Sequence, residues 1–136
     1  MKVDYAFICD YAEAAGGSGK VSALGIGFDT IYAPQLPAIH RHFSLVVQIR
    51  ATLVETGQKN VQLDMIDEDG KNVIPTLRAP IILPKVEGRL ETVGRLVMEF
   101  GLVKFERYGS YSLRIIIDGE EKAAVPFQVS EPPKTA

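Results

Sequence analysis

Apolar and polar side chains alternate along most of this chain, and that period of two constrains its fold more than any other feature. In the run 43–53, Phe43, Leu45, Val47 and Ile49 share one face, while polar side chains take most of the positions between them. Successive side chains of an extended strand point to opposite faces of a sheet. The pattern therefore predicts strands with one buried face and one face in contact with water.

The same alternation recurs in other segments, and no long amphipathic helix is visible between them. It is clearest in the runs 3–11, 61–65, 111–117 and 123–129. The inward positions predict a core made of Phe7, Leu24, Phe43, Val47, Ile49, Leu63, Leu113, Ile115 and Phe127. We expect this core to lie between two sheets.

One segment fits two periods. Apolar residues recur near helical spacing at Leu90, Val93, Val97 and Phe100. Leu96, Met98 and Phe100 also alternate with their neighbours as in a strand. We expect a strand over 95–100 because its neighbours along the chain are strands. For 88–95, helix and strand both stay open.

Turn residues separate the predicted strands. Asp-Gly pairs lie within 67–71 and 117–121, and this dipeptide between alternating runs is a strong hairpin signal. The polar segment 55–60 contains Gly57 and predicts another reversal. Prolines are expected in loops or at strand margins, because proline cannot donate a hydrogen bond within a sheet. The sequence thus predicts an all-β fold, an antiparallel two-sheet sandwich of seven to eight strands.

Length and composition limit the classes of protein further. A chain of 136 residues predicts one domain over 1–130, followed by a flexible C-terminal tail over 131–136. The formal net charge of -2 offers no basic field for nucleic acid. A single cysteine, Cys9, excludes an internal disulfide and fits a reducing compartment. Because neither a signal peptide nor a membrane span is recognisable, we expect a cytoplasmic protein without nucleic-acid or membrane partners.

The glycine-rich stretch 15–27 suggests a phosphate-binding loop, but its spacing does not fit one. Such a loop has glycine five residues before its Gly-Lys pair and Ser or Thr after the lysine, where this chain has Ala14 and Val21. The dinucleotide fingerprint also fails, since Thr30 stands in place of its third glycine. We expect glycines 16–19 to reverse the chain in a hairpin, and no cofactor to bind.

His40 and His42 are the candidate metal ligands. Two residues apart on a strand, they would project to the same side, close enough to share an ion. A zinc site needs at least one further ligand, and the sequence designates none. The alternation places both histidines on the mostly solvent-facing side, so exposed histidines without metal are the favoured interpretation.

Two other motifs are better explained by structure than by chemistry. An EF-hand alignment of the Asp-Glu-Asp-Gly segment places Met65 and Thr76 at the first and last ligand positions, where neither can hold calcium. Cys9 shares a face with Phe7 and Tyr11, which favours core packing over a reactive thiol. The sequence therefore designates no catalytic, cofactor-binding or metal-binding residue.

Two stretches carry a family resemblance. Residues 4–49, with Cys-Asp-Tyr-Ala, a glycine-containing turn and a Gly-Ile-Gly-Phe-Asp-Thr-Ile strand, resemble the start of a family of short, functionally uncharacterised bacterial proteins. Residues 105–129 resemble that family's ending and also the last hairpin of immunoglobulin-like sandwiches. The resemblance implies an immunoglobulin-like sandwich in which Gly109 and Tyr111 open a strand and the tyrosine bonds a nearby backbone group. The antibody type itself is excluded, since the chain has one Cys and no Trp.

The absence of a chemical motif favours a non-enzymatic binding or assembly module that acts through a sheet face or edge strand. Val46, Ile116 and Ile8 fall on otherwise polar faces, as a surface for a protein partner or a second copy would require. A small-ligand or metal-dependent enzyme using His40 and His42 is one alternative. A structural component of a phage-like or other multiprotein particle is another.

Overall fold

The computed structural model describes residues 1–15 and 19–134, and these form ten strands and one short 3-10 helix. The strands are β1 (Lys2–Cys9), β2 (Tyr11–Ala14), β3 (Val21–Leu24), β4 (Thr30–Tyr32), β5 (Ala38–Thr52), β6 (Gly57–Ile66), β7 (Leu77–Leu83), β8 (Glu91–Phe105), β9 (Gly109–Ile117) and β10 (Glu120–Ser130). The 3-10 helix η1 (Leu53–Glu55) joins β5 to β6. The all-β class is confirmed.

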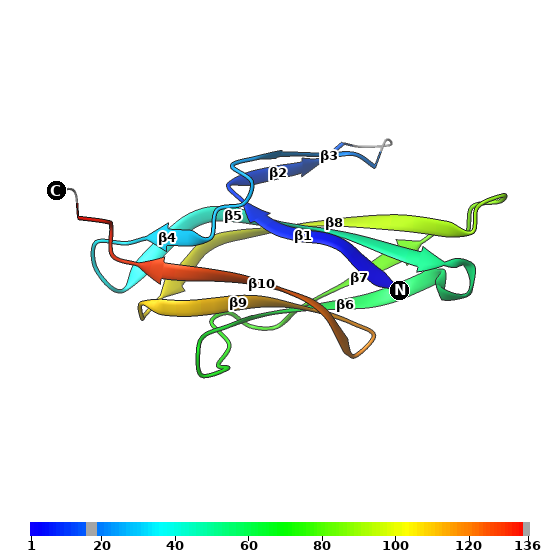
Figure 1. Cartoon of the computed structure of the whole chain (residues 1–136). Helices are drawn as coiled ribbons and strands as arrows, with labels where there is room; N and C mark the ends of the chain where they lie inside the picture. Colours follow the sequence, from blue (N-terminus) through cyan, green and yellow to red (C-terminus); the bar gives the residue numbers. More distant parts are fainter. Residues whose placement is uncertain (16–18, 135–136) are drawn as a thin grey trace.

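Two main sheets enclose the core, and a third, smaller sheet lies outside them (Figure 1). One main sheet has the order β1-β5-β8 and the other the order β4-β10-β9-β6-β7. Pairing is antiparallel except between β4 and β10. The third sheet is the hairpin of β2 and β3, which runs above the β5–β8 face.

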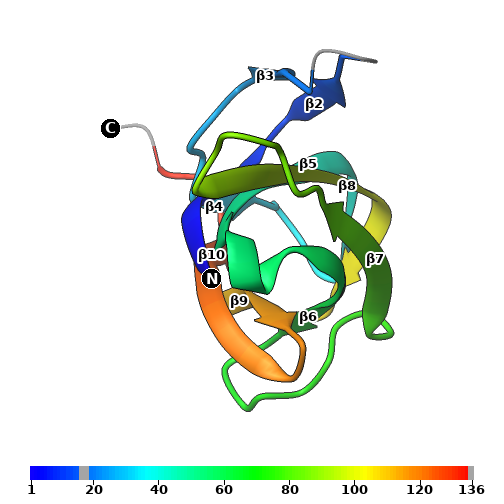
Figure 2. The same cartoon turned by 90° about the vertical axis from the view of Figure 1, so that its right-hand side faces the viewer.

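The edges of the two main sheets lie against each other. β1 contacts β10 on one side and β7 contacts β8 on the other, so the five-stranded sheet curls around the core. The end-on view shows this curl (Figure 2). The strands of the body therefore cover one another's edges, which is one way in which proteins avoid edge-to-edge association.

Most of the predicted core is confirmed. The members that are buried as expected are Phe43, Val47, Ile49, Leu63, Leu113, Ile115 and Phe127. The prediction was wrong for two residues, Phe7 and Leu24. The β1–β5 register shifts between Val3 and Tyr5, so the alternation changes phase there and Ile8 faces the core in place of Phe7. Leu24 is 70% exposed on the outer face of the β2–β3 hairpin.

The expected number of seven to eight strands was too low. One strand that was missed is β7, an edge strand with Pro80 in its middle, paired with Asn60. Proline is tolerated at a sheet edge, where its missing N–H removes no ladder bond. The prediction of a strand over 95–100 is confirmed, because β8 extends through these residues. For 88–95, where helix and strand were both possible, the structure shows strand from Glu91 onward.

The turns predicted at 67–71 and 117–121 are confirmed. The reversal predicted over 55–60 occurs earlier, at η1, because β6 already begins at Gly57. The turn predicted at glycines 16–19 lies largely outside the described residues. Ile117 pairs with Glu120, and Asp118 and Gly119 between them both have positive φ, of 49° and 84°. This is the backbone form that Asp-Gly favours in a two-residue hairpin. The turn at 67–70 also forms, with a hydrogen bond from the Gly70 amide to the Asp67 carbonyl, but six further residues precede β7.

Two further expectations concern the C-terminal tail and membrane spans. Residues 131–134 form no strand or helix, and the rest of the predicted tail lies outside the described residues. Among the residues that the structure describes, no helix is long and apolar enough to cross a membrane.

Candidate functional site

The β2–β3 hairpin forms a second layer on the outer face of the β1-β5-β8 sheet. Its inward side chains are small: Ala12 is buried, and Val21 and Ala23 pack against the cluster that contains Cys9 and Val46. Val46 is only 1% exposed because this layer covers it. The prediction that Val46 and Ile8 form an exposed partner surface was therefore wrong, since Ile8 lies in the main core. Ile116 is half-buried.

Larger side chains point away from the body on the other face of the hairpin. Tyr11 and Leu24 lie directly opposite each other in the β2–β3 register, and both are exposed. Glu13 and Ser22 form the next outward pair. Ile26, just beyond β3, is also exposed. The hairpin thus presents a partly apolar outer surface.

Polar contacts fix the hairpin to the body. The Arg95 Nη1 donates to the Gly19 carbonyl at 2.7 Å, which joins one end of the hairpin to β8. At the other end, the Leu24 carbonyl accepts from the Asp10 amide at 3.0 Å. Gly25 has φ +69°, and a Cβ there would collide with the Asp10 carboxylate. The two ends are therefore set by specific contacts, while small apolar side chains fill the space between them.

The hydrogen-bond pattern shows which backbone groups of β3 have no strand partner. The Ala15 amide donates to the Lys20 carbonyl at 2.8 Å, next to the Ala14–Val21 pair. Because antiparallel pairs alternate between bonded and non-bonded, the amides of Ser22 and Leu24 point toward β2. Those of Val21 and Ala23 point away from it. Within the described residues, β3 pairs with β2 alone.

The two histidines lie in different surroundings. The His40 ring packs near Phe28 and Phe43, at centroid distances of 6.4 Å and 5.6 Å, and its buried Nε2 has no hydrogen-bond partner. Burial lowers the pKa of His40. The expectation that both histidines face solvent therefore fails for His40.

His42 instead lies beside the base of the hairpin, where β2 begins. Its Nδ1 is 2.9 Å from the Asp10 carbonyl, its ring lies 5.9 Å from that of Tyr11, and its Nε2 is 3.9 Å from Glu99 Oε1. No group of three or more His, Cys, Asp or Glu side chains in the described part of the chain could hold a metal ion. The hypothesis of an enzyme that uses both histidines gains no support from this geometry.

Cys9 is fully buried, as expected from its apolar neighbours. Its Sγ lies 3.5 Å from the Tyr11 carbonyl and 3.8 Å from the Ser44 carbonyl. Burial, and then the negative charge of Asp10, raises the pKa of this thiol. A raised pKa lowers the thiolate fraction, so Cys9 is a packing residue between β1 and the hairpin.

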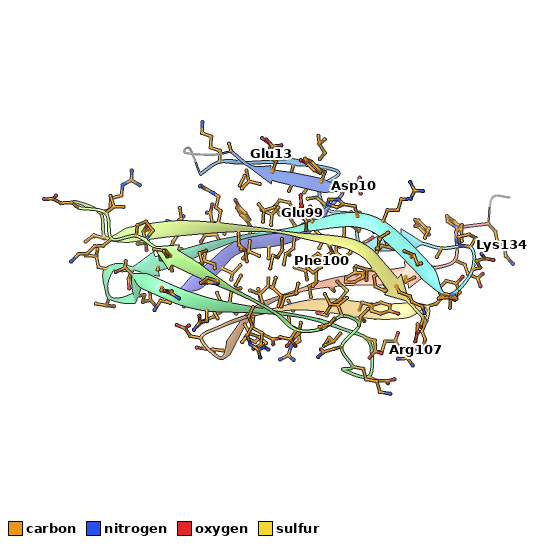
Figure 3. All side chains as sticks on the ribbon, turned by 180° about the vertical axis from the view of Figure 1, so that it is seen from behind. Asp10, Glu13, Glu99, Phe100, Arg107 and Lys134 are labelled. Carbon is orange, nitrogen blue, oxygen red and sulfur yellow. The ribbon has the colours of Figure 1, made fainter. Side chains whose placement is uncertain are left out.

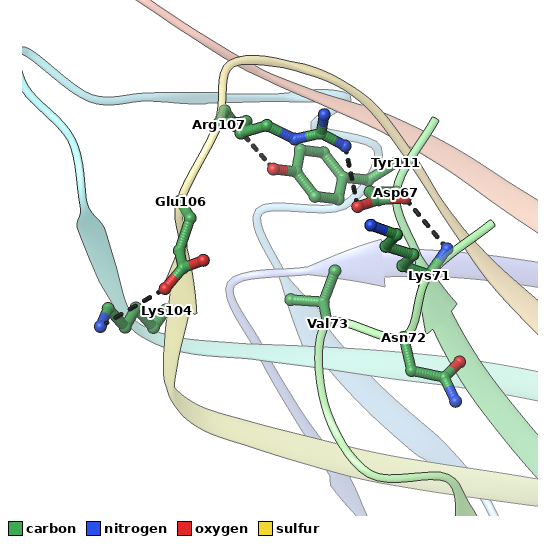
Figure 4. A pocket seen from close by; sticks show the side chains of 8 residues that line it. All are labelled: Asp67, Lys71, Asn72, Val73, Lys104, Glu106, Arg107 and Tyr111. Atoms are coloured by element: carbon green, nitrogen blue, oxygen red, sulfur yellow. Dashed lines mark hydrogen bonds and ion pairs between the residues drawn. The ribbon is translucent and has the colours of Figure 1, made fainter. Parts of the chain in front are cut away.

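A cleft of about 490 Å³ opens on the side of the molecule away from the hairpin, between the β6–β7 connection and the end of β8 (Figure 4). Figure 3 shows the separation, with Glu13 of the hairpin and Arg107 of the cleft on opposite sides of the molecule. The cleft is lined by Asp67, Lys71, Asn72, Val73, Lys104, Glu106, Arg107 and Tyr111.

Asp67 organises one wall of this cleft. Its Oδ1 accepts from the backbone amides of Asp69 and Lys71, at 2.9 Å and 3.0 Å, and its Oδ2 from Arg107 at 2.9 Å. The bond from the Lys71 amide is the main cause that lowers the pKa of Asp67, followed by the Asp69 amide and Arg107. The Asp67 carboxylate thus accepts hydrogen bonds from the turn that it belongs to, which gives this acidic residue a structural role.

Tyr111 supplies an aromatic wall. Its hydroxyl donates to the Arg107 carbonyl at 2.5 Å, four residues upstream, so the predicted bond to a nearby backbone group is confirmed. The ring is held edge-on against Phe105 and stacked against Phe127. Gly109, with φ +136°, opens β9 as expected.

The sequence predicted neither the cleft nor which strand has an unpaired edge, which in the structure is the outer edge of β3. The cleft brings Lys71 close to the segment 104–107. These two parts of the chain are more than thirty residues apart and share no motif. The free edge depends on the hairpin leaving the main sheet at Asp10, which the continuous alternation of 3–11 conceals. The sequence shows that residues 21–24 carry no charge, but this indicates an unprotected edge only when the strand is known to lie at the edge of a sheet.

The chain was compared with known proteins. Residues 4–130 match a family of unknown function, DUF6941. No curated protein matches the sequence. Among solved structures, the fold is similar to part of the Pseudomonas fluorescens alkylpurine DNA glycosylase AlkC bound to DNA containing an abasic site analog, with 10% identity and a TM-score of 0.42. The alignment covers 74% of this chain but only 27% of the glycosylase chain. By its match over nearly the whole sequence, the chain belongs to the DUF6941 family.

Proposed function

We propose that this protein is a non-catalytic binding module that associates with a second copy of itself through the free edge of β3. One observation carries the proposal: β3 has an unpaired edge among the described residues, and no charge, proline or bulge protects it. Unpaired strand edges are templates for pairing with another chain, and natural proteins normally block them.

The other edge strands among the described residues carry such protection, and β2, whose outer edge is also unpaired, carries Glu13. β1 has a register irregularity and lies beside β10. β7 contains Arg78 and Pro80 and lies beside β8. β4 is only three residues long. The contrast within one chain marks β3 as the strand that is left available.

A second copy fits this edge without electrostatic penalty. If Ser22 lies on the two-fold axis, Val21 of one copy pairs with Ala23 of the other, which is the pairing that their outward amides require. Lys20 then lies opposite Leu24, so no like charges meet. The outer faces of the two hairpins would join into one four-stranded surface lined by Tyr11 and Leu24.

Two finer expectations belong to the same proposal. We propose that the sandwich is of the immunoglobulin-like type, which the bond from Tyr111 to the Arg107 carbonyl supports. We also propose that the protein works in the bacterial cytoplasm, which the single, buried thiol of Cys9 supports.

Light scattering coupled to size exclusion, over a wide range of protein concentration, tests the association. The wild type should shift from monomer to dimer as concentration rises. Ala23→Pro should stay monomeric, because it removes an outward N–H and leaves the bonds to β2 in place. Ser22→Thr is the matched control and should dimerise like the wild type, because Thr at this outward-facing position keeps both edge amides.

Circular dichroism should show that all three proteins are folded. A wild type that remains monomeric at every concentration would contradict the proposal. So would an Ala23→Pro variant that dimerises as well as the wild type does.

A further inference from the structure

The polar cleft on the far side of the sandwich carries a second, independent inference. Its volume of about 490 Å³ lies within the range of small-molecule sites. Lys71 and Asn72 from the β6–β7 connection, and Lys104 and Glu106 from the end of β8 and the residues after it, line its polar part. Val73 and the fixed ring of Tyr111 line the rest (Figure 4).

Most of the charges in this lining are already paired. Arg107 bonds Asp67 within the cleft and, through the same nitrogen, Asp69 beside it. Lys104 lies 3.6 Å from Glu106. These pairs leave the ammonium of Lys71 as the one cation of the lining without an ion-pair partner among the described residues. The cleft therefore offers one positive charge beside an apolar wall.

We infer that this cleft binds a carboxylate attached to an apolar group, with Lys71 as its counter-ion. A monoanion fits better than a phosphate because Asp67 and Glu106 would repel a second negative charge. The Asn72 amide, which has no side-chain partner among the described residues, supplies a further donor. Val73 and Tyr111 would cover the apolar group of the ligand.

Two sources could supply such a carboxylate: a free small acid or the C-terminus of a peptide. Both present a carboxylate next to an aliphatic side chain, and terminal carboxylates are a recurring recognition element. The lining residues Lys71, Lys104 and Glu106 are exposed, so the end of a peptide could reach the cleft.

Titrations followed by amide chemical shifts test the inference with four probes: N-acetyl-leucine, N-acetyl-leucinamide, the peptide N-acetyl-Ala-Ala-Leu and its C-terminal amide. The acids should shift the amides of Asn72, Val73 and Glu106 saturably, with affinities in the millimolar range or better. Each amide should bind at least about tenfold more weakly than its acid, because it lacks the charge that pairs with Lys71. A peptide acid that binds more tightly than N-acetyl-leucine identifies a peptide terminus as the ligand, and equal affinities identify a small acid.

Lys71→Gln should weaken the binding of both acids about tenfold. The Lys71 side chain is exposed and has no partner among the described residues, so the variant should fold. Lys85→Gln is the matched control: Lys85 is also exposed but lies on the β7–β8 connection, separated from the cleft by the length of β8. It should bind like the wild type.

Three results would each overturn the inference: no saturable shift at the cleft, equal binding of acid and amide, or unchanged binding by Lys71→Gln. All three are independent of dimerisation, because the cleft and the β3 edge lie on opposite sides of the molecule (Figure 3).

Discussion

Gly94 shows how a single residue sets the approach of the two main sheets. It lies in β8 where β7 crosses beside it, and a Cβ at this position would be 2.5 Å from Leu83 Cδ2 and 3.0 Å from Ile81 Cδ1. Both of those side chains belong to the buried core. The glycine is therefore needed for close packing and not for a turn.

Gly94→Ala should lower the free energy of unfolding by about 1–3 kcal/mol, because an added methyl group overpacks this junction. Gly101→Ala, on the same strand, is the control: its nearest contact would be an ordinary 3.8 Å from the Arg41 carbonyl oxygen. Chemical denaturation measures both variants. Equal stability of the two would contradict the packing assigned to Gly94.

His40 gives the protein a defined acid sensitivity. Burial lowers its pKa in the folded state below the ordinary value of 6.5. The unfolded chain then binds a proton more readily, so the free energy of unfolding should fall as the pH drops below 6.5, until the pH passes the pKa of the folded state.

His40→Phe should remove this part of the pH dependence, since phenylalanine keeps an aromatic ring beside Phe28 and Phe43 but does not titrate. Denaturant unfolding of both proteins at pH values from about 7.5 to about 5 measures the difference. Identical slopes for the variant and the wild type would show that His40 is not the responsible group.

At the scale of elements, the sequence predicts long strands well and breaks between strands poorly. In the run 43–53, Phe43, Leu45, Val47 and Ile49 are buried as predicted. Leu53, at the end of the run, lies in η1 and is 37% exposed. In the first segment, a bulge after Val3 inverts the faces, so alternation alone assigned Phe7 to the wrong side. A bulge is not visible in the alternation of apolar and polar residues along the sequence. It forms through pairing with another strand, here β5, which is remote in the sequence.

The hairpin of β2 and β3 depends on its packing against the sheet beneath it. A two-stranded hairpin is marginal by itself, and Val46 is the buried apolar anchor on the sheet beneath it. Val46→Ala should therefore speed amide hydrogen exchange in β2 and β3 through local opening.

Val47→Ala is the matched control, because Val47 is equally buried but faces the main core. It should lower the global free energy of unfolding by about 1–3 kcal/mol and leave the hairpin no more exposed to exchange than the rest of the sheet. If Val46→Ala changed exchange uniformly across the protein, the hairpin would be an integral part of the body and not a separate layer.

At the scale of the whole molecule, closure of the two sheets is the reason why we propose the hairpin edge as the site of association. β1 and β10 on one side, and β7 and β8 on the other, cover each other's edges. The hairpin stands outside this closed body, so its edge keeps free hydrogen-bonding groups. Sequence patterns could predict the strands but not this closure, because which edges meet is determined by twist and packing over the whole chain.

Amide hydrogen exchange measured over a range of protein concentrations tests the central claim most directly. The account predicts that the amides of Val21 and Ala23 become slower to exchange as concentration rises, because they bond to the second copy. The amides of Ser22 and Leu24, already directed toward β2, should change much less. Exchange of Val21 and Ala23 that is fast at every concentration would contradict the account.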